Sequence, residues 1–412
     1  MPDGTRHHYL HPFEAPFYTE GTSLVPYWLL QDAATRPPFA EAVTIQNRVA
    51  ESRRAPKKQG EGEFSGPLNY AYHFDAGLYA KFLRGYAEAR GVTRREGRIV
   101  DVKLRGEDGF VQSVTMQDGS EIAADLFIDC SGFRGLIIEQ AMKTGYENWT
   151  HWLPCDRAIA VPCARTEPFT PYTRATARTA GWQWRIPLQH RIGNGHVFSS
   201  SFMSEDEATG MLLANLDGGA LAEPRALRFT AGTRRKAWIG NVVAIGLSSG
   251  FLEPLESTSI HLIQSGIAKL LTLFPGRDMD PMLADRYNAL LGADMDNIKD
   301  FLILHYHANP GRTDPFWVER REMALPETLV AREEQYRRSG RLMLGPEELF
   351  RDASWLAVLN GQEIVAQDYN PLADVLDSAA NSTQVRQVAE VIKRAAPTLP
   401  LHDAALAVAM GG

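Results

Sequence analysis

The sequence predicts an α/β fold with mixed sheets and a mostly helical C-terminal region, and three observations support this prediction. Residues 241–247 form a nearly continuous apolar run, which is typical of a strand buried on both faces. A glycine-containing turn follows, and then a helix that begins near Glu256 and ends at Pro275-Gly276. The expected buried face of this helix consists of Ile260, Ile263, Ile267, Leu270, Leu271 and Phe274. Further helices are expected over residues 280–304, 326–339 and 384–395.

Length and composition exclude several classes of protein. The 412 residues are enough for two or three packed lobes, and the net charge of −7 argues against a general nucleic-acid binder, which needs a basic surface. No apolar run approaches the ~18–20 residues that a membrane span requires. The three cysteines, Cys130, Cys155 and Cys163, form no CxxC pair and predict no disulfide framework. We therefore expect a cytoplasmic enzyme with no nucleic-acid or membrane partner.

The N-terminal half begins with loops and one clear helix. Residues 51–63 are polar and charged, and we expect them to form a mobile surface loop. A helix is expected to start at Asp75, whose side chain can cap it, and to end at Gly91. The apolar face of this helix consists of Leu78, Phe82, Leu83 and Tyr86.

A β meander follows this helix. Strands are expected over 99–104 and 111–116, with a tight hairpin turn at 117–120 and a short apolar strand over 123–128. That strand ends in Asp129-Cys-Ser-Gly132, an Asp-x-x-Gly pattern that is familiar from flavin-binding oxidoreductases. Capping of the turn is an equally good explanation of Asp129.

An aromatic strand is expected over Gly181–Pro187. Trp182 and Trp184 share one face of it, and Pro187 either stops the strand or places it at a sheet edge. Two indoles one strand pitch apart can form the wall of a site for a flat aromatic ligand. On composition alone, however, core packing is the better explanation.

The run Glu256-Ser-Thr-Ser259 contains the strongest candidate site. Helix N-termini present unpaired N–H groups that suit an anion or the polar edge of a cofactor, and the hydroxyls of Thr258 and Ser259 add donors. Glu256 beside them can accept a proton from a substrate. The competing explanation is a capping box, in which Ser257 or Thr258 is the N-cap and the glutamate only favours the helix dipole.

Other motifs are incomplete. Gly60-Glu-Gly62 and Gly193-Asn-Gly195 do not complete the Gly-x-Gly-x-x-Gly pattern of a dinucleotide site, since the first lies in the polar loop and the second in an expected β-turn. His305 and His307 lack a third ligand nearby, and the expected helix separates their rings, so no metal site is predicted.

Several motifs in order along the chain resemble the flavin-dependent tryptophan halogenases, from His11-Pro-Phe13 to about Pro371. They are Asp129-Cys-Ser-Gly-Phe-Arg-Gly135, Cys155-Asp-Arg-Ala158, Gly181-Trp-x-Trp-x-Ile-Pro187, Asn194-Gly195, Gly240-Asn-Val-Val-Ala-Ile-Gly-Leu247, Phe251-Leu-Glu-Pro-Leu-Glu-Ser-Thr-Ser-Ile-His-Leu262, Asp300-Phe-Leu-Ile-Leu-His-Tyr-His307, Pro315-Phe-Trp317, Ser354-Trp355 and Leu359-Asn-Gly-Gln362. The resemblance implies a flavin-monooxygenase-like, FAD-binding fold of the glutathione-reductase type. The FAD-binding core would span 1–275, with an interleaved substrate-side sheet at about 155–235, and a mostly helical substrate-side region would span 276–412.

The resemblance also implies an activity. The family uses reduced FAD from a separate flavin reductase, O2 and a halide ion to halogenate an electron-rich aromatic, tryptophan or another indole, and its members are often homodimers. Flavin-dependent aromatic monooxygenation and a non-catalytic remnant are the alternatives.

Residue roles follow from the same resemblance. Glu256 corresponds to the active-site glutamate, and Thr258 and Ser259 to the halide site. Leu247 and Ile260 would contact FAD through their backbone. The remaining matches are Trp182 and Trp184 beside the flavin and His11 and Phe13 at the aromatic substrate. Ser259 replaces a glycine that is common in enzymes acting on free tryptophan, which leaves the identity of the substrate open.

The start of the chain departs from the family pattern. The His-Pro-Phe match begins at residue 11, whereas family members first have a strand, a Gly-rich FAD loop and a catalytic lysine. Lys57, Lys58 and Lys143 do not fit that lysine. We therefore expect an N-terminally truncated fold that binds FAD weakly, halogenates poorly and is only marginally soluble.

Overall fold

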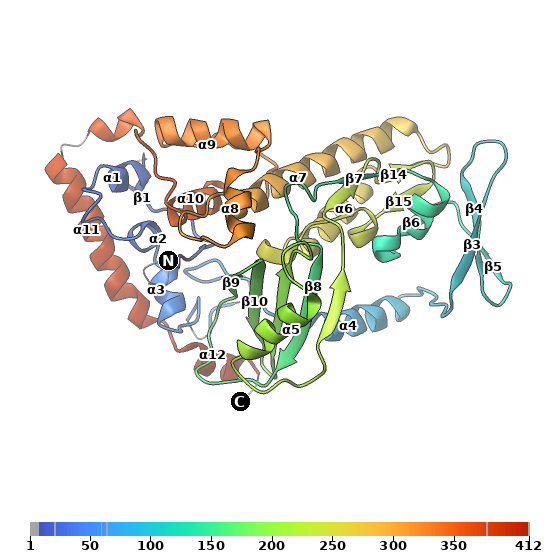
Figure 1. Ribbon diagram of the computed structural model, residues 1–412, viewed down its shortest axis with the longest axis horizontal. Coiled ribbons are helices and arrows are strands. Elements are labelled where there is room, and N and C mark those ends of the chain that lie inside the picture. The colour runs from blue at the N-terminus through green and yellow to red at the C-terminus, as the bar shows by residue number, and fades with distance from the viewer. Residues whose placement is uncertain (1–7, 20–21, 59, 63–64, 376–377, 411–412) are drawn as a thin grey trace. The chain divides into compact units, whose positions relative to one another are not determined.

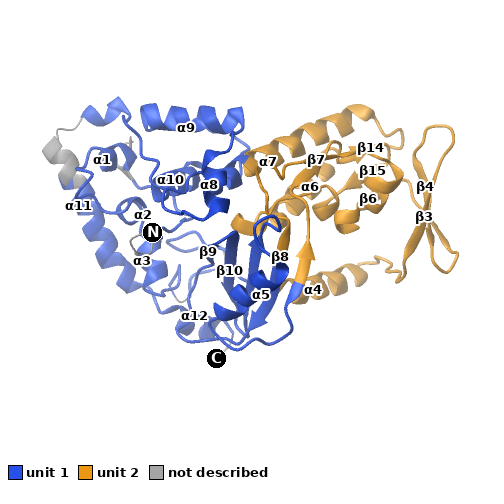
Figure 2. Cartoon of the chain, viewed as in Figure 1, with its two compact units in different colours: residues 1–73, 159–225, 300–412 blue, residues 74–158, 226–299 orange. Residues whose placement is uncertain are grey.

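The computed structural model describes residues 8–19, 22–58, 60–62, 65–375 and 378–410 (Figure 1). The chain forms two compact units, shown in Figure 2. Unit 1 contains Met1–His73, Ile159–Arg225 and Asp300–Gly412, and unit 2 contains Phe74–Ala158 and Ala226–Lys299. Neither unit is one continuous stretch of sequence. Among the described residues, no helix combines the length and the apolar character needed to cross a membrane.

Unit 2 contains a small sheet built on two parallel strands. β15 (Val242–Ala244) pairs in parallel with β6 (Phe127–Asp129) and antiparallel with β14 (Trp238–Ile239). The three residues of β15 are fully buried, which confirms the expected buried strand. β15 is shorter than the apolar run because Gly246, with φ of +72°, turns the chain out of the extended conformation.

The expected meander is confirmed as an antiparallel sheet of order β3-β4-β5, formed by Ile99–Leu104, Val111–Met116 and Glu121–Ala123. The strand expected over 123–128 is wrong in its bounds. Ala123 ends β5, and the chain turns before β6 begins at Phe127 in a different sheet. A third sheet in this unit has the order β16-β13-β7 and is formed by Gly250–Phe251, Gly232–Arg234 and Tyr146–Asn148.

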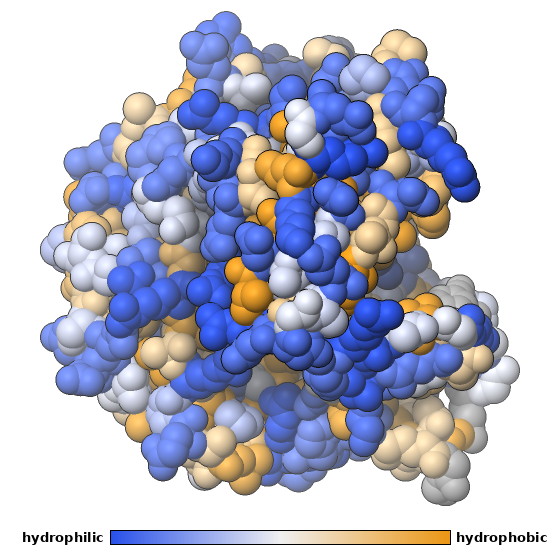
Figure 3. All heavy atoms as spheres, turned by 90° about the vertical axis from the view of Figure 1, so that its right-hand side faces the viewer, coloured by the Kyte–Doolittle hydropathy of each residue, from blue (hydrophilic) through white to orange (hydrophobic). Residues whose placement is uncertain are grey.

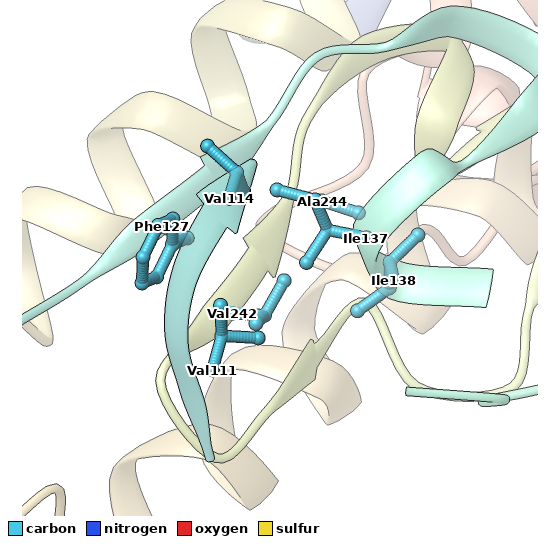
Figure 4. Packing of buried hydrophobic residues seen from close by; sticks show 7 residues of the cluster. All are labelled: Val111, Val114, Phe127, Ile137, Ile138, Val242 and Ala244. Carbon is cyan, nitrogen blue, oxygen red and sulfur yellow. The ribbon is translucent and has the colours of Figure 1, made fainter. Parts of the chain in front are cut away.

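The core of unit 2 joins the meander to the parallel strands. In Figure 4, side chains from β4, β6, β15 and the π-helix η2 (Leu136–Ala141) point toward one another. The cluster consists of Val111, Val114, Phe127, Ile137, Ile138, Val242 and Ala244, each at most 8% exposed. This packing holds the ends of β6 and β15 on a common support.

Helix α4 (Ala76–Glu88) is confirmed, but its surroundings differ from a core helix. Asp75 caps it by accepting hydrogen bonds from the backbone N–H groups of Gly77 at 2.9 Å and Leu78 at 3.2 Å. None of its residues is buried, and the four apolar side chains Leu78, Phe82, Leu83 and Tyr86 are 63%, 64%, 43% and 50% exposed. Exposed hydrophobic side chains also occur elsewhere. On the face of the molecule that lies at the right of Figure 1, Figure 3 shows hydrophobic groups scattered among hydrophilic ones.

Helix α6 (Ser259–Thr272) buries a narrower face than expected. Only Gly266 and Leu270 are buried, whereas Leu271 and Phe274 are more than 60% exposed, so the expected six-residue buried face is wrong. The reason is the close approach of α6 to its neighbours at Gly266, where a Cβ would lie 3.2 Å from the hydroxyl of Tyr287. A helix that packs so closely along one line leaves its flanking side chains outside the contact.

Unit 1 contains most of a five-stranded sheet of order β12-β8-β11-β10-β9. Its strands are Arg225–Arg228, Arg157–Cys163, Ile192–Phe198, Gly181–Pro187 and Arg174–Arg178. β10 has neighbours on both sides, so Pro187 stops this strand and does not mark an edge. The expectation of a turn at Gly193–Gly195 is wrong, because the turn is already closed by a 2.8 Å hydrogen bond from Leu188 N to Arg191 O and these glycines lie inside β11.

Helices make up most of the rest of unit 1. They are α1 (Val25–Leu29), α2 (Phe39–Val43), α3 (Gln46–Glu51), α5 (Glu205–Ala214), α8 (Pro315–Glu322), α9 (Glu327–Ser339), α10 (Asp352–Gly361), α11 (Ser378–Ala395) and α12 (His402–Ala409). α7 (Pro281–His307) contributes residues to both units. The three helices expected after residue 276 are therefore confirmed. β1 (Tyr18–Thr19) and β2 (Thr22–Ser23) form a two-stranded ribbon.

The expected loop over 51–63 is anchored at its beginning. Ala55 is 2% exposed, and its N–H donates to the carbonyl oxygen of Pro400 at 3.0 Å. The expectation of a mobile loop is therefore wrong for this part, because its backbone pairs with a distant segment of the same unit. Residues 59 and 63–64 of the loop lie outside the described part of the chain.

Candidate functional site

The predicted site lies where the chain leaves β15 and enters α6. After Ala244 come two 3-10 turns, η3 (Gly246–Ser248) and η4 (Pro254–Glu256), with the short strand β16 between them. Ser257 then adopts a left-handed conformation, with φ of +55° and ψ of +35°. Side-chain-bearing residues rarely adopt this conformation, and such strain occurs preferentially at functional sites.

The helix begins later than predicted, which changes the role of Glu256. α6 begins at Ser259, so Glu256 belongs to η4 and is not in the first turn of the helix. Its side chain is half-buried. A carboxylate outside the helix can therefore face a ligand at the helix N-terminus without forming part of its cap.

Thr258 occupies the N-cap position but does not cap the helix. Its carbonyl oxygen accepts a hydrogen bond from Leu262 N at 2.9 Å, whereas its side chain makes no capping hydrogen bond. The capping-box alternative is therefore wrong. The physical reason is that Thr258 has helical backbone angles, with φ of −79° and ψ of −14°, whereas a capping residue needs extended ones.

The hydroxyl of Thr258 has no hydrogen-bond partner among the described residues, although the residue is only 1% exposed. A buried hydroxyl without a partner costs roughly 1–3 kcal/mol, so it indicates a group that a ligand can satisfy. The N–H groups in the first turn of α6 also lack partners within the helix. These donors together fit a small anion or the polar edge of a cofactor.

Two loops lie at the carboxyl ends of the parallel strands. η1 (Gly132–Arg134) comes shortly after β6, and η3 comes shortly after β15. Ile245 N donates to the carbonyl oxygen of Asp129 at 3.0 Å, and the hydroxyl of Ser248 donates to the same oxygen. The carboxyl ends of parallel strands are where ligands bind in open α/β sheets. Leu247 in η3 and Ile260 in α6, both predicted at the cofactor, are 39% and 42% exposed.

Asp129 has the structural role that the sequence left open. It is 1% exposed, and its carboxylate accepts hydrogen bonds at 2.8 Å from the backbone N–H groups of Ser131, Ile137 and Ile138. Asp129 thus caps the turn after β6 and the start of η2.

The aromatic strand in unit 1 places its two tryptophans side by side. The ring centroids of Trp182 and Trp184 are 6.0 Å apart, with 54° between the ring planes. Trp182 is buried and Trp184 is half-buried, so core packing accounts for the first indole and leaves part of the second accessible. Gly195 pairs with Trp184 on the neighbouring strand, and a Cβ there would lie only 2.0 Å from the indole Cη2.

His11 and Phe13, also in unit 1, have different surroundings. The imidazole of His11 lies 5.8 Å from the ring of Phe301 and 6.4 Å from that of Phe350, measured between centroids. Phe13 is 62% exposed, and its backbone N–H donates to Oε1 of Gln46. Phe301 and Phe350, which stack at 4.0 Å, are neighbours of His11 that the sequence pattern did not reveal.

The predicted site residues thus fall into two sets. Unit 2 brings together Glu256, Thr258, Ser259 and Ile260 along one segment, with the η3 loop that carries Leu247 against α6. Unit 1 holds Trp182, Trp184, His11 and Phe13. Ser248 was missed, because nothing in the sequence around it marks a serine that is fully buried between two strand ends.

Comparisons with known proteins match most of the chain to one family. The family model described as tryptophan halogenase matches residues 3–378. The chain is 33% identical to tryptophan 6-halogenase SttH of Streptomyces toxytricini, over 96% of this chain and 80% of SttH. It is 35% identical to tryptophan 7-halogenase RebH of Lentzea aerocolonigenes, over 81% of this chain and 64% of RebH, which is less than two thirds of that protein.

Solved structures give the same result. BrvH, a flavin-dependent halogenase from Brevundimonas sp. BAL3, superposes with a TM-score of 0.91 at 42% identity, over 97% of this chain and 82% of BrvH. Xcc4156, a flavin-dependent halogenase from Xanthomonas campestris, superposes with a TM-score of 0.90 at 41% identity, over 96% of this chain and 79% of Xcc4156.

Proposed function

Because the chain belongs to the tryptophan halogenase family, we propose that it catalyses the FAD-dependent halogenation of an electron-rich aromatic, tryptophan or another indole. The observation that carries this proposal is the buried hydroxyl of Thr258 at the start of α6, which has no hydrogen-bond partner among the described residues. Beside it, the first-turn N–H groups of α6 are available to a ligand. A halide ion can accept hydrogen bonds from both.

Thr258 and Ser259 bind the halide in this proposal. The hydroxyl and backbone donors replace part of the hydration shell of the ion, and the positive end of the helix dipole stabilises its charge. Ser259 places a second hydroxyl at the start of α6, where a glycine is common in enzymes acting on free tryptophan. In this proposal that hydroxyl is a further donor to the halide.

Glu256 acts on the aromatic substrate. When a halogen replaces hydrogen on an aromatic ring, the ring must lose a proton, and a positioned carboxylate can accept it. The half-buried position of Glu256 next to the helix start suits this role, because the residue is not sealed in the core. In this proposal the family resemblance assigns Trp182 and Trp184 to the flavin and His11 and Phe13 to the aromatic substrate.

FAD is held by the backbone around Leu247 and Ile260 in this proposal. The residues present fit such a group, since the η1 and η3 loops end two parallel strands and Leu247 and Ile260 are partly exposed there. The chemistry that FAD would supply, once reduced by a separate flavin reductase, is the two-electron reduction of O2 to an oxidant strong enough to oxidise the halide. Association into homodimers belongs to this proposal as well.

Product analysis tests the proposal. The full chain is incubated with FAD, NADH, a flavin reductase, O2 and bromide, with tryptophan and indole as separate substrates. We expect a brominated product, recognised in the mass spectrum by the paired bromine isotopes, and no such product when bromide is omitted.

Other products distinguish the alternatives. A hydroxylated arene that forms equally well without bromide would identify an aromatic monooxygenase. The absence of any product across a panel of indoles would contradict the proposed activity for this chain. The expectation that the chain binds FAD weakly remains a prediction, and a tight stoichiometric yellow complex after purification would contradict it.

A further inference from the structure

A buried arginine connects the two loops at the ends of the parallel strands. Arg234 lies in β13 and is 8% exposed. Its Nε donates to the carbonyl oxygen of Ser248 at 3.1 Å, and its Nη2 donates to that of Phe133 at 3.4 Å. Its own backbone N–H donates to the carbonyl oxygen of Ser249 at 2.8 Å. One residue thus contacts both η3 and η1.

The charge of Arg234 is balanced within the same cluster. Its Nη1 forms an ion pair with Oε2 of Glu139 at 2.7 Å, and the Glu139 oxygen also accepts a hydrogen bond from Gly145 N at 3.1 Å. Its guanidinium lies 4.9 Å above the ring of Tyr146. Because Glu139 neutralises it, the guanidinium contributes geometry and not a free positive charge for an anionic ligand.

The backbone near η1 leaves room for the guanidinium. Gly135 has φ of +52°, and a Cβ at this position would lie 2.7 Å from Nη2 of Arg234. A side chain at residue 135 would therefore push the guanidinium away from the carbonyl oxygen of Phe133. This close approach is an observation independent of the hydrogen bonds.

We propose that Arg234 is a positioning residue for the flavin site, which it prepares by holding the η1 and η3 loops in one fixed arrangement. The proposal rests on the proposed function, in which the backbone around Leu247 contacts FAD. Arg234 holds the two loops by three hydrogen bonds, and its ion pair with Glu139 fixes the guanidinium that makes two of them. Loops held in this way lose little conformational freedom on binding, whereas free loops would have to be ordered first.

Hydrogen–deuterium exchange of the full chain without FAD tests the connection itself. Arg234→Met is expected to increase exchange in peptides covering residues 131–136 and 245–250, and Arg234→Lys is expected to give a smaller increase because it retains the charge next to Glu139. Arg235→Met, a change at the exposed neighbouring arginine, is the control and should leave both peptides unchanged.

Two glycine-to-alanine variants test the same connection without changing Arg234 itself. Gly135→Ala should loosen the same two peptides, because its new Cβ meets the guanidinium. Gly109→Ala introduces the same kind of backbone strain, at φ of +71°, where nothing lies within 4 Å of the new Cβ. It should therefore lower stability without changing exchange in the two loops.

FAD titration, followed by flavin fluorescence, gives the second readout. We expect Arg234→Met and Gly135→Ala to raise the Kd for FAD by on the order of tenfold, comparable to the effect of removing a group that orients a metal ligand. The proposal is overturned if neither Arg234→Met nor Gly135→Ala changes the hydrogen–deuterium exchange of the two loops. It is also overturned if exchange in the loops becomes faster while the Kd for FAD stays the same. If the unmodified chain binds no FAD, the proposed function is contradicted, whereas faster loop exchange would still support the connection through Arg234.

Discussion

The side-chain amide of Asn241 forms two opposed hydrogen bonds with the backbone of Val111, 130 residues earlier in the chain. Oδ1 accepts from Val111 N at 2.9 Å, and Nδ2 donates to Val111 O at 2.8 Å. Nδ2 also donates to the carbonyl oxygen of Asp125 at 3.1 Å. Asn241 therefore fastens the meander to the start of β15.

Removing this amide should destabilise the protein. Asn241→Ala leaves the N–H and the carbonyl of Val111 buried without partners, and we expect the free energy of unfolding to fall by about 3 kcal/mol. Urea denaturation measures the change. Gln112→Ala, at an exposed position next to Val111, is the control and should change stability by less than about 0.5 kcal/mol. Equal effects of the two changes would contradict the role of Asn241.

Thr258→Val should weaken halide binding without lowering the free energy of unfolding. Because the hydroxyl of Thr258 has no hydrogen-bond partner among the described residues, its removal should leave the free energy of unfolding unchanged or raise it by about 1 kcal/mol. Thr144→Val is the matched control. The hydroxyl of Thr144 donates to the carbonyl oxygen of Ile138 at 3.1 Å, so its loss should cost about 1 kcal/mol.

The same two variants test the halide site. Thr258→Val should raise the KM for bromide in the halogenation assay, whereas Thr144→Val should leave it unchanged. A loss of stability in Thr258→Val as large as that in Thr144→Val would mean that the hydroxyl has a structural partner in solution.

The left-handed backbone of Ser257 predicts a stabilising substitution. Ser257→Gly removes the steric cost of φ of +55° and should raise the free energy of unfolding by about 0.5–1 kcal/mol. The β-branched change Ser257→Val should lower it by more than that. Ala89→Gly is the control, because Ala89 has φ of −64° and gains nothing from glycine. Thermal and urea denaturation measure the change. A lower free energy of unfolding for Ser257→Gly would contradict the strained conformation of Ser257.

Two glycines of β11 differ in the space available for a side chain. Gly195→Ala places a methyl group where the indole of Trp184 lies, and we expect a loss of about 1–3 kcal/mol together with a shift in tryptophan fluorescence. At Gly193 the nearest atom to a new Cβ is 3.5 Å away. Gly193→Ala should therefore have little effect on either measurement, and similar behaviour of the two variants would show that Trp184 does not pack on Gly195.

The burial of His196 predicts that the free energy of unfolding falls at acidic pH. Burial lowers the pKa of His196, and the positive charge of Arg178 lowers it further. Its Nδ1–H donates to the carbonyl oxygen of Ala208 at 3.2 Å, while Nε2 has no hydrogen-bond partner among the described residues, so protonation would bury an unpaired N–H.

The direction of the pH effect follows from these contacts. The unfolded chain, with a histidine pKa of about 6.5, binds this proton more readily than the folded one, so the free energy of unfolding falls as the pH drops below about 6.5. We expect His196→Gln to flatten this part of the stability profile between pH 7 and pH 5. His190→Gln, at an exposed position, is the control, and an equal slope for unmodified protein and His196→Gln would contradict the prediction.

Local signals in the sequence predicted elements well where neighbouring residues decide the conformation. Asp75 caps α4 as expected, and the alternation in Gly181–Pro187 correctly predicts a strand with Trp182 and Trp184 on one face. The helix after the candidate site was also correctly expected, but its start was placed three residues too early. A serine and a threonine suggest a cap at Glu256–Thr258, and nothing local reveals that Ser257 turns left-handed.

The sequence by itself therefore determined the α/β class, most of the helices and strands, the family and the segment that contains Glu256 and Thr258. Only the tertiary structure decided that the apolar face of α4 is exposed, that Gly195 makes room for an indole and that Arg234 holds two loops. The physical reason is distance along the chain. Caps, turns and periodicity depend on residues a few positions apart, whereas burial and hydrogen-bond partners depend on segments that folding brings together from a hundred residues away.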